Sequence, residues 1–280
     1  MTDADLTLQS SPLAADGAPV RIRYREAGAG PAVVVLHGGW GYEIYPFDRQ
    51  IAALSLRHRV IVPDRTGYGG SGRLSFQPTD FHERAAGETL ALLDALGIER
   101  AILWGHSDGA VIALRLGLMA PARVDRIVAE ATHFFRRKPA SRAFFETMRD
   151  RPDALGARVA ATLAHEHGEN DWRPLLAING DAWLRIADEA QSDRADLYDD
   201  RLSQLSAPVL LIHGARDPRT EPGELTALRD VLERRASLDR MRTSVVVLDD
   251  GGHSPHSEKA TADRVTQAAV DFLSATVSVR

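Results

Sequence analysis

The chain has 280 residues, of which 44% are hydrophobic and 26% are charged, as is typical of soluble globular proteins. This composition excludes global disorder and predicts one large α/β domain with an insertion, or two small domains. The chain contains no cysteine, which excludes disulfides, thiolate nucleophiles and cysteine-bound metals. Its net charge of −5 disfavours a general nucleic-acid-binding function.

The first residues of the chain and its apolar runs indicate the cellular location of the protein. Residues 1–6 are acidic and lack the basic-then-apolar order of a signal peptide. The runs Ala32–Leu36, Val209–Ile212 and Val245–Leu248 are far shorter than the roughly 20 residues that span a bilayer. We therefore expect a cytoplasmic protein that binds neither membranes nor nucleic acids.

Short β-branched runs alternate with longer helical patterns along most of the chain, which favours a mainly parallel sheet covered by helices. In chain order, the predicted strands are Val20–Glu26, Ala32–Leu36, Arg59–Val62, Ala101–Trp104, Val124–Ala129, Val209–Ile212 and Val245–Leu248. The predicted helices are Thr79–Leu96, Ala110–Met119, Glu221–Arg235 and Ser257–Leu273.

The alternation fails between residues 132 and 205, where helical patterns and aromatic residues occur without a run typical of a buried strand. An ordinary pair of crossover helices would need only roughly 30–40 residues, about half of this stretch. We therefore predict an α/β core in two parts, residues 1–131 and 206–280, with a helical cap at residues 132–205 inserted between them.

The segment Gly105–Gly109 (GHSDG) lies between a predicted strand and a predicted helix. A G-x-S-x-G turn in this position holds its serine in a strained conformation, with the hydroxyl exposed above the sheet. The glycines are needed because side chains at their positions would collide with neighbouring backbone. The pattern therefore predicts Ser107 as a nucleophile.

A serine hydroxyl needs a base to remove its proton, and the base needs an acid to orient it. Asp217 follows the run Val209–Ile212, and His253 follows the run Val245–Leu248 on a glycine-containing loop. Ligands of open α/β sheets bind beyond the carboxyl ends of the strands. We therefore expect Ser107, Asp217 and His253 to meet there.

Together these motifs resemble those of the α/β-hydrolase superfamily over roughly residues 20–276. The matching features are His37-Gly38-Gly39 after a strand, residues 64–69 (DRTGYG) with Ser71, the turn at Ser107, the Gly-x-x-Asp at 214–217, and Gly252-His253. The resemblance implies a mostly parallel eight-stranded sheet flanked by helices, with a helical cap. It also implies Ser107 as nucleophile, Asp217 as acid and His253 as base, in the chain order usual for this fold.

An oxyanion hole needs two backbone N–H donors aimed at the developing negative charge. We expect one from Asp108, which follows the nucleophile, and the other from the loop after His37. Gly39 is the first candidate for this second donor, and Trp40 is the alternative.

The Ser-Asp-Gly turn is similar to that of biphenyl-hydrolase-like, valacyclovir hydrolase-type esterases, which act on amino-acid esters. This likeness implies that the Asp108 side chain pairs with a cationic substrate group. We also expect Trp40 to contact the substrate. The alternative is that Asp108 bonds only to local backbone. Other families of the same fold fit less well. Proline iminopeptidases carry proline at the position of Trp40, and haloalkane dehalogenases and typical epoxide hydrolases use aspartate, not serine, at the position of Ser107.

Other polar residues have simpler explanations. Glu130 follows a predicted strand and is an alternative acid for the base. The sequence His165-Glu166-His167 resembles a metal-binding pair but has no third ligand nearby, so we expect a solvated helix face. His106 and His213 are expected to be structural.

The predicted activity is hydrolysis of a small carboxylic ester through an acyl-enzyme, with a small-molecule substrate and no metal or organic cofactor. Cleavage of aminoacyl esters or amides, and C–C bond hydrolysis of a β-diketone, are alternatives that use the same residues. A receptor with an idle triad is the alternative from another class of protein. The sequence leaves open the substrate and whether the protein is a monomer or a homodimer.

Overall fold

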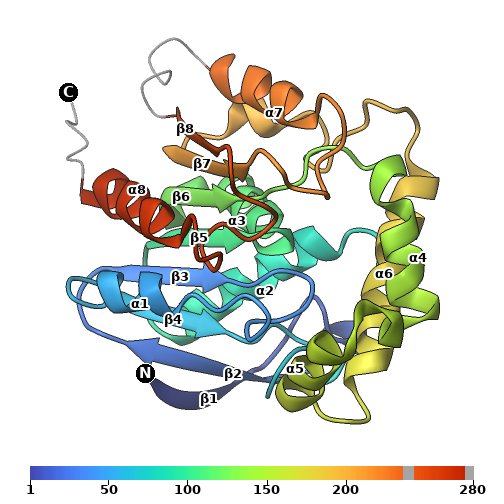
Figure 1. Cartoon of the computed structure of the whole chain (residues 1–280). Helices are drawn as coiled ribbons and strands as arrows, with labels where there is room; N and C mark the ends of the chain where they lie inside the picture. Colours follow the sequence, from blue (N-terminus) through green and yellow to red (C-terminus); the bar gives the residue numbers. More distant parts are fainter. Residues whose placement is uncertain (236–242, 275–280) are drawn as a thin grey trace.

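A computed structural model describes residues 1–235 and 243–274, and in this part of the chain eight strands form one sheet (Figure 1). The strands are β1 (Thr2–Leu8), β2 (Val20–Ala27), β3 (Ala32–Leu36), β4 (Arg59–Pro63), β5 (Ala101–His106), β6 (Val124–Glu130), β7 (Val209–Gly214) and β8 (Thr243–Leu248). Their order across the sheet is β1-β2-β4-β3-β5-β6-β7-β8. β2 runs antiparallel to its neighbours β1 and β4, and the other neighbouring pairs are parallel. The predicted mostly parallel eight-stranded sheet is confirmed.

The seven strands predicted from the sequence all occur, with ends displaced by two residues at most. β1 was not predicted, because it is an edge strand whose side chains are mostly exposed. Its apolar residues do alternate, ending in the buried Leu8, and this weak period of two was the available signal.

Helices cover both faces of the sheet. They are α1 (Asp48–Leu54), α2 (Phe81–Ala95), α3 (Asp108–Met119), α7 (Glu224–Glu233) and α8 (Ala262–Ser274). Along β3, Val34 and Leu36 pack into the same cluster as residues of α2 and α3, whereas Val33 and Val35 pack with residues of α1 and α8. A strand buried on both faces is apolar at every position, which is why Ala32–Leu36 could be predicted.

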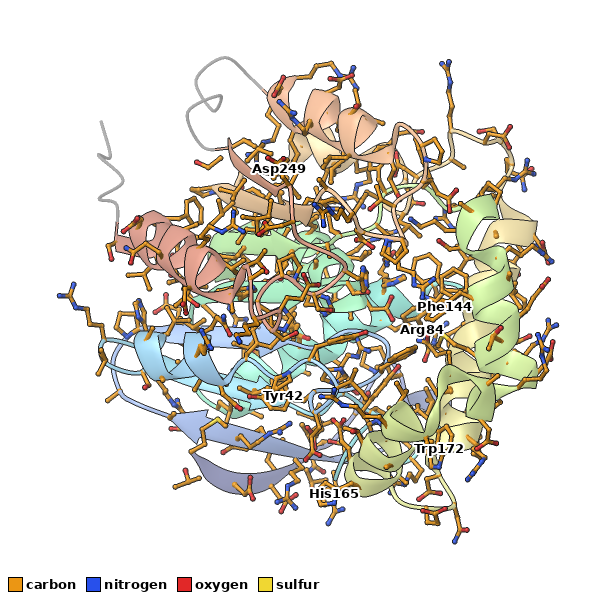
Figure 2. The ribbon with its side chains drawn as sticks, viewed as in Figure 1. Tyr42, Arg84, Phe144, His165, Trp172 and Asp249 are labelled. Atoms are coloured by element: carbon orange, nitrogen blue, oxygen red, sulfur yellow. The ribbon has the colours of Figure 1, made fainter. Side chains whose placement is uncertain are left out.

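Between β6 and β7 the chain forms α4 (Arg142–Asp150), α5 (Ala157–His167) and α6 (Trp172–Glu189), which stand together beside the sheet (Figure 1). Phe144 points from α4 toward the sheet, whereas His165 near the end of α5 is exposed (Figure 2). Short 3-10 turns connect the larger elements at Ala15–Gly17, Pro121–Arg123, Pro139–Ser141, Pro152–Leu155 and Leu202–Gln204. The predicted core segment 206–280 and the resemblance up to residue 276 extend into residues outside the described part. Among the described helices, none has the length and apolar character required to cross a membrane.

Candidate active site

Ser107 occupies the turn between β5 and α3 with φ 54° and ψ −121°. A positive φ is rare for residues other than glycine and marks strained backbone. A Cβ atom added to Gly105 would lie 2.1 Å from the carbonyl oxygen of Gly109, and one added to Gly109 would lie 2.0 Å from that of Leu36. Both flanking positions therefore require glycine for the turn to hold Ser107 in this conformation.

Ser107, His253 and Asp217 form a continuous chain of hydrogen bonds. The Oγ atom of Ser107 is 3.1 Å from Nε2 of His253. The Nδ1 atom of His253 is 3.0 and 2.9 Å from the two carboxylate oxygens of Asp217. These contacts orient Nδ1–H toward the acid and leave Nε2 facing the serine hydroxyl.

The electrostatics around Asp217 favour its ionised form. Burial alone would raise the pKa of Asp217, but His253 and the amide of Arg219 donate hydrogen bonds to it and hold this pKa below its ordinary value. The three residues come from loops after β7, β8 and β5, so the carboxyl ends of three parallel strands bring them together.

A second histidine, not singled out in the sequence, also contacts Ser107. The Nε2 atom of His133 is 3.3 Å from Ser107 Oγ, and its ring stacks against His253 with 5.8 Å between centroids. Burial, aided by the nearby charge of Lys138, lowers the pKa of His133 well below 6.5, so the ring is neutral. His133 lies three residues after the end of β6, and this position beyond a strand end was the signal that could have identified it.

The loop after β3 lies beside the candidate nucleophile. A Cβ atom added to Gly38 would lie 3.2 Å from Cβ of Ser107, and one added to Gly39 would lie 2.8 Å from a carboxylate oxygen of Asp108. Within residues 1–235 and 243–274, no group accepts a hydrogen bond from the amides of Gly39, Trp40 or Asp108. These amides are therefore available to an oxygen atom of a ligand.

The same loop is fastened to the carboxyl end of α5. The carboxylate of Glu166 accepts hydrogen bonds from the amides of Tyr42 (2.6 Å) and Glu43 (3.0 Å), and His167 Nε2 donates to the carbonyl oxygen of Trp40 (3.0 Å). Burial raises the pKa of Glu166 to about 7. The expectation of a solvated face is wrong for Glu166 and His167, which are buried because they satisfy the backbone of this loop.

The described residues contain no group of three or more side chains arranged to hold a metal ion. Within the motif considered as a metal-binding pair, the first histidine, His165, is largely exposed.

The side chain of Asp108 is buried and held by donors from two helices. Its Oδ1 atom contacts His82 Nε2 (3.2 Å) and accepts from Trp183 Nε1 (3.1 Å), while Oδ2 accepts from Asn179 Nδ2 (3.3 Å). Burial would raise the pKa of Asp108, but the contact with His82, the nearby charge of Arg65 and the hydrogen bond from Asn179 together outweigh this effect and hold the pKa at about 2. Neither expectation for Asp108 included these partners, because they lie on α2 and α6.

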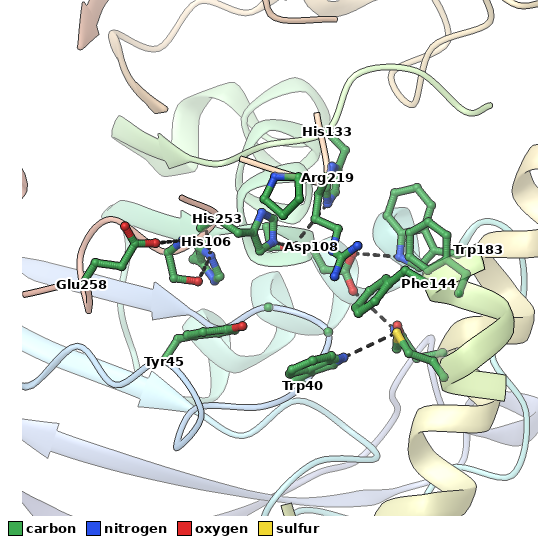
Figure 3. A pocket seen from close by; sticks show the side chains of 18 residues that line it. Trp40, Tyr45, His106, Asp108, His133, Phe144, Trp183, Arg219, His253 and Glu258 are labelled. Carbon is green, nitrogen blue, oxygen red and sulfur yellow. Dashed lines mark hydrogen bonds between the residues drawn. The ribbon is translucent and has the colours of Figure 1, made fainter. Parts of the chain in front are cut away.

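These groups share one cavity of about 280 Å³, shown in Figure 3. Ser107, His253 and Asp108 line it, and its walls are rich in aromatic side chains from the loop after β3 and from α4 and α6, namely Trp40, Tyr45, Phe144, Phe145 and Trp183. The side chain of Trp40 stacks with Tyr45 and donates to Met148 Sδ at 3.4 Å. A cavity of this size suits a small ligand.

The alternative acid Glu130 contacts a different histidine. Its carboxylate accepts from the backbone amide (2.8 Å) and Nδ1 (2.9 Å) of His256 and from Nε1 of Trp104 (3.2 Å). His106 Nε2 donates to the carbonyl oxygen of His253 at 2.9 Å. Glu130 and His106 therefore bind the loop that carries His253.

Ser107, His253 and Asp217 thus meet at the carboxyl edge of a mainly parallel sheet that has helices on both faces. The chain belongs to the alpha/beta hydrolase family, whose model matches residues 33–268.

Individual relatives carry different names. The chain is 33% identical over 180 residues to an epoxide hydrolase of Caballeronia sordidicola. The aligned region covers 59% of this chain and 53% of that protein. The chain spans about a third to a half of the length of the epoxide hydrolases that it matches. It is 38% identical over 268 residues to the magnesium-chelatase 30 kDa subunit of Rhodobacter capsulatus, covering 87% of each chain. A solved hydrolase structure from Pseudomonas aeruginosa matches with a TM-score of 0.72 at 22% identity, over 98% of this chain and 99% of that one.

Proposed function

We propose that this protein is a serine hydrolase that cleaves a small carboxylic ester through an acyl-enzyme on Ser107. One observation carries the proposal: the hydrogen-bonded chain from Asp217 through His253 to Ser107 ends in a cavity of about 280 Å³. The strained turn at Ser107 supports it, since this conformation exposes the hydroxyl at the end of the sheet.

In the first half of the reaction, Ser107 Oγ attacks the acyl carbon while its proton passes to Nε2 of His253. The carboxylate of Asp217 stabilises the imidazolium cation that results. The amides of Asp108 and Gly39, or Trp40 in place of Gly39, receive the oxyanion. The bond to the alcohol oxygen then breaks, and the departing alcohol takes the proton from His253.

In the second half, a water molecule gives a proton to His253 and attacks the acyl carbon of the ester formed on Ser107. The bond to Ser107 Oγ breaks, the serine recovers its proton from His253, and the carboxylic acid leaves. We further propose that residues 132–205 act as a cap, because α4 and α6 supply Phe144, Phe145 and Trp183 to the aromatic walls of the cavity.

Several relatives are named epoxide hydrolases, which suggests epoxide hydrolysis as a second reaction. The serine at position 107 disfavours it. Attack of a serine hydroxyl on an epoxide would form an ether, and the water activated by His253 would not cleave that ether. A carboxylate nucleophile instead forms an ester that water can cleave. The carboxylate of Asp108 is held by His82, Trp183 and Asn179, and is therefore unsuited to act as that nucleophile.

A serine-directed fluorophosphonate and a chromogenic ester, p-nitrophenyl butyrate, test the proposal. We expect the wild-type protein to be labelled irreversibly on the peptide that contains Ser107, and to hydrolyse the ester. The Ser107→Ala variant should lose both properties, with a loss in kcat on the order of 10⁶ by analogy with subtilisin. Unchanged hydrolysis by Ser107→Ala, or the absence of labelling at Ser107, would contradict the proposal.

A further inference from the structure

Arg219 is a positively charged residue in the wall of the active-site cavity. Its guanidinium carbon lies 3.1 Å from the centroid of the Phe144 ring, so the charge sits over an aromatic face from α4 (Figure 3). The backbone of Arg219 is fixed, since its amide donates to Asp217 Oδ1 (2.8 Å) and its carbonyl oxygen accepts from Lys138 Nζ (3.1 Å). Hydrogen bonds at its amide and at its carbonyl oxygen therefore hold the backbone of Arg219 in place.

The N–H groups of this guanidinium have no partner. Throughout the described residues, no carboxylate oxygen lies within 4.0 Å of the Arg219 guanidinium nitrogens and no group accepts a hydrogen bond from them. Burial lowers the pKa of Arg219 below its ordinary value, because desolvation disfavours the cation. Arginine nevertheless remains charged at neutral pH, so its five N–H donors are available to a ligand.

The acidic residues of the same wall are already occupied. Asp108 is held by three side-chain donors, as described above. The carboxylate of Glu258 accepts from the amides of Gly252 (2.8 Å) and Ser254 (3.1 Å). Among the aspartate, glutamate and arginine side chains that line the cavity, Arg219 is therefore the one whose hydrogen-bonding groups are unused.

We propose that Arg219 binds a carboxylate group on the substrate, so that the protein acts on esters that carry a carboxylate in their acid or alcohol part. The inference rests on the proposed function, because it places this anion beside the ester attacked by Ser107. The planar guanidinium matches the two oxygens of a carboxylate, and its partial burial strengthens such a pair. Since one cavity of about 280 Å³ holds both Arg219 and Ser107, the carboxylate and the ester belong to one small molecule.

Two pairs of esters of matched shape test where the carboxylate binds. Monoethyl succinate, with the charge in the acid part, is compared with neutral ethyl 4-methylpentanoate. The acetate ester of 4-hydroxybutyrate, with the charge in the alcohol part, is compared with neutral 4-methylpentyl acetate. We expect the wild-type protein to have the higher kcat/KM for the anionic member of at least one pair.

Substitutions at Arg219 separate recognition of the charge from packing. Arg219→Met should lower kcat/KM for the preferred anionic ester by roughly 10- to 100-fold, the usual effect of losing a charge-assisted hydrogen bond. It should leave kcat/KM for the neutral partner nearly unchanged. Arg219→Lys keeps the charge without the planar fork and should give an intermediate value. Arg216→Met is the matched control, because it removes the same charge from an exposed side chain three residues away.

The outcomes distinguish this inference from the function on which it rests. An equal loss on anionic and neutral esters in Arg219→Met would show a packing role, and an equal loss in Arg216→Met would show general electrostatic attraction; either result overturns the inference and leaves the hydrolase intact. If no ester is hydrolysed in a Ser107-dependent manner, the proposed function fails. Binding of succinate monoester to Ser107→Ala, measured by calorimetry, then still decides the inference. If the double variant Ser107→Ala/Arg219→Met binds the succinate monoester with the same affinity as Ser107→Ala, the inference is refuted.

Discussion

The buried ion pair between Lys138 and Glu224 allows a quantitative prediction about stability. The side chains are 1% and 2% exposed, and Lys138 Nζ lies 2.6 and 2.5 Å from the two oxygens of Glu224. The same carboxylate also accepts from the amides of Phe134 (2.7 Å), Phe135 (3.0 Å) and Glu221 (2.9 Å). The pair therefore joins the segment that leaves β6 to the beginning of α7.

Replacing the lysine alone leaves a buried carboxylate without a cation. Removing one partner of a buried pair commonly costs about 3–5 kcal/mol, because the remaining charge stays desolvated. We expect Lys138→Met to lower the free energy of unfolding by that amount. The double variant Lys138→Met/Glu224→Gln should be less destabilised than the sum of the single variants, since it removes both charges.

Urea denaturation followed by tryptophan fluorescence and circular dichroism measures these free energies. Arg137→Met is the matched control, because Arg137 pairs with Asp193 at the surface, where the side chains are 42% and 88% exposed. An exposed pair contributes about 0–1 kcal/mol. The reasoning is refuted if Lys138→Met costs no more than Arg137→Met, or if the double variant loses the full sum of the single losses.

Three further predictions concern the active site. Asp217→Asn should lower kcat by about 10⁴-fold with little loss of folding stability, by analogy with other Ser-His-Asp enzymes; steady-state kinetics and a thermal melt check it, and a loss below tenfold would contradict the assigned role. Asp108→Asn should slow p-nitrophenyl butyrate and p-nitrophenyl 2-aminobutyrate equally, because side-chain donors already occupy the carboxylate; a selective loss on the amino ester would instead show that Asp108 binds an ammonium group. Burial raises the pKa of Glu166 from 4.5 to about 7, so the folded state binds this proton more tightly than the unfolded state does. The free energy of unfolding of the wild-type protein should therefore fall relative to that of Glu166→Gln as pH rises through this range. If urea denaturation gives the same difference between the two proteins at pH 5 and at pH 8, this pKa is unperturbed.

The sheet and the turn at Ser107 are predictable because local sequence encodes them. Ala32–Leu36 is apolar at every position because both faces of β3 are covered. Gly105 and Gly109 are required where a Cβ atom would meet backbone at about 2 Å. The helix α1 was not predicted, since it is short, and the expected helix from Ser257 begins only at Ala262.

The surroundings of the candidate nucleophile depend on contacts that span most of the chain. Ser107 and His253 are 146 residues apart, and Asp108 and Asn179 are 71 apart. Positions after strand ends suggested where Ser107 and His253 would lie, because parallel strands share one carboxyl edge.

The sequence by itself determined the family, the parallel sheet, and the three residues expected to meet beyond it, because strand runs and turn glycines report constraints on nearby backbone. Only the tertiary structure decided the partners of each polar side chain. In the structure, the carboxylate of Asp108 accepts hydrogen bonds from side chains of α2 and α6, whereas the guanidinium of Arg219 has no hydrogen-bond partner among the described residues. Such pairings depend on how helices that lie far apart in the sequence pack together, and no local pattern records that geometry.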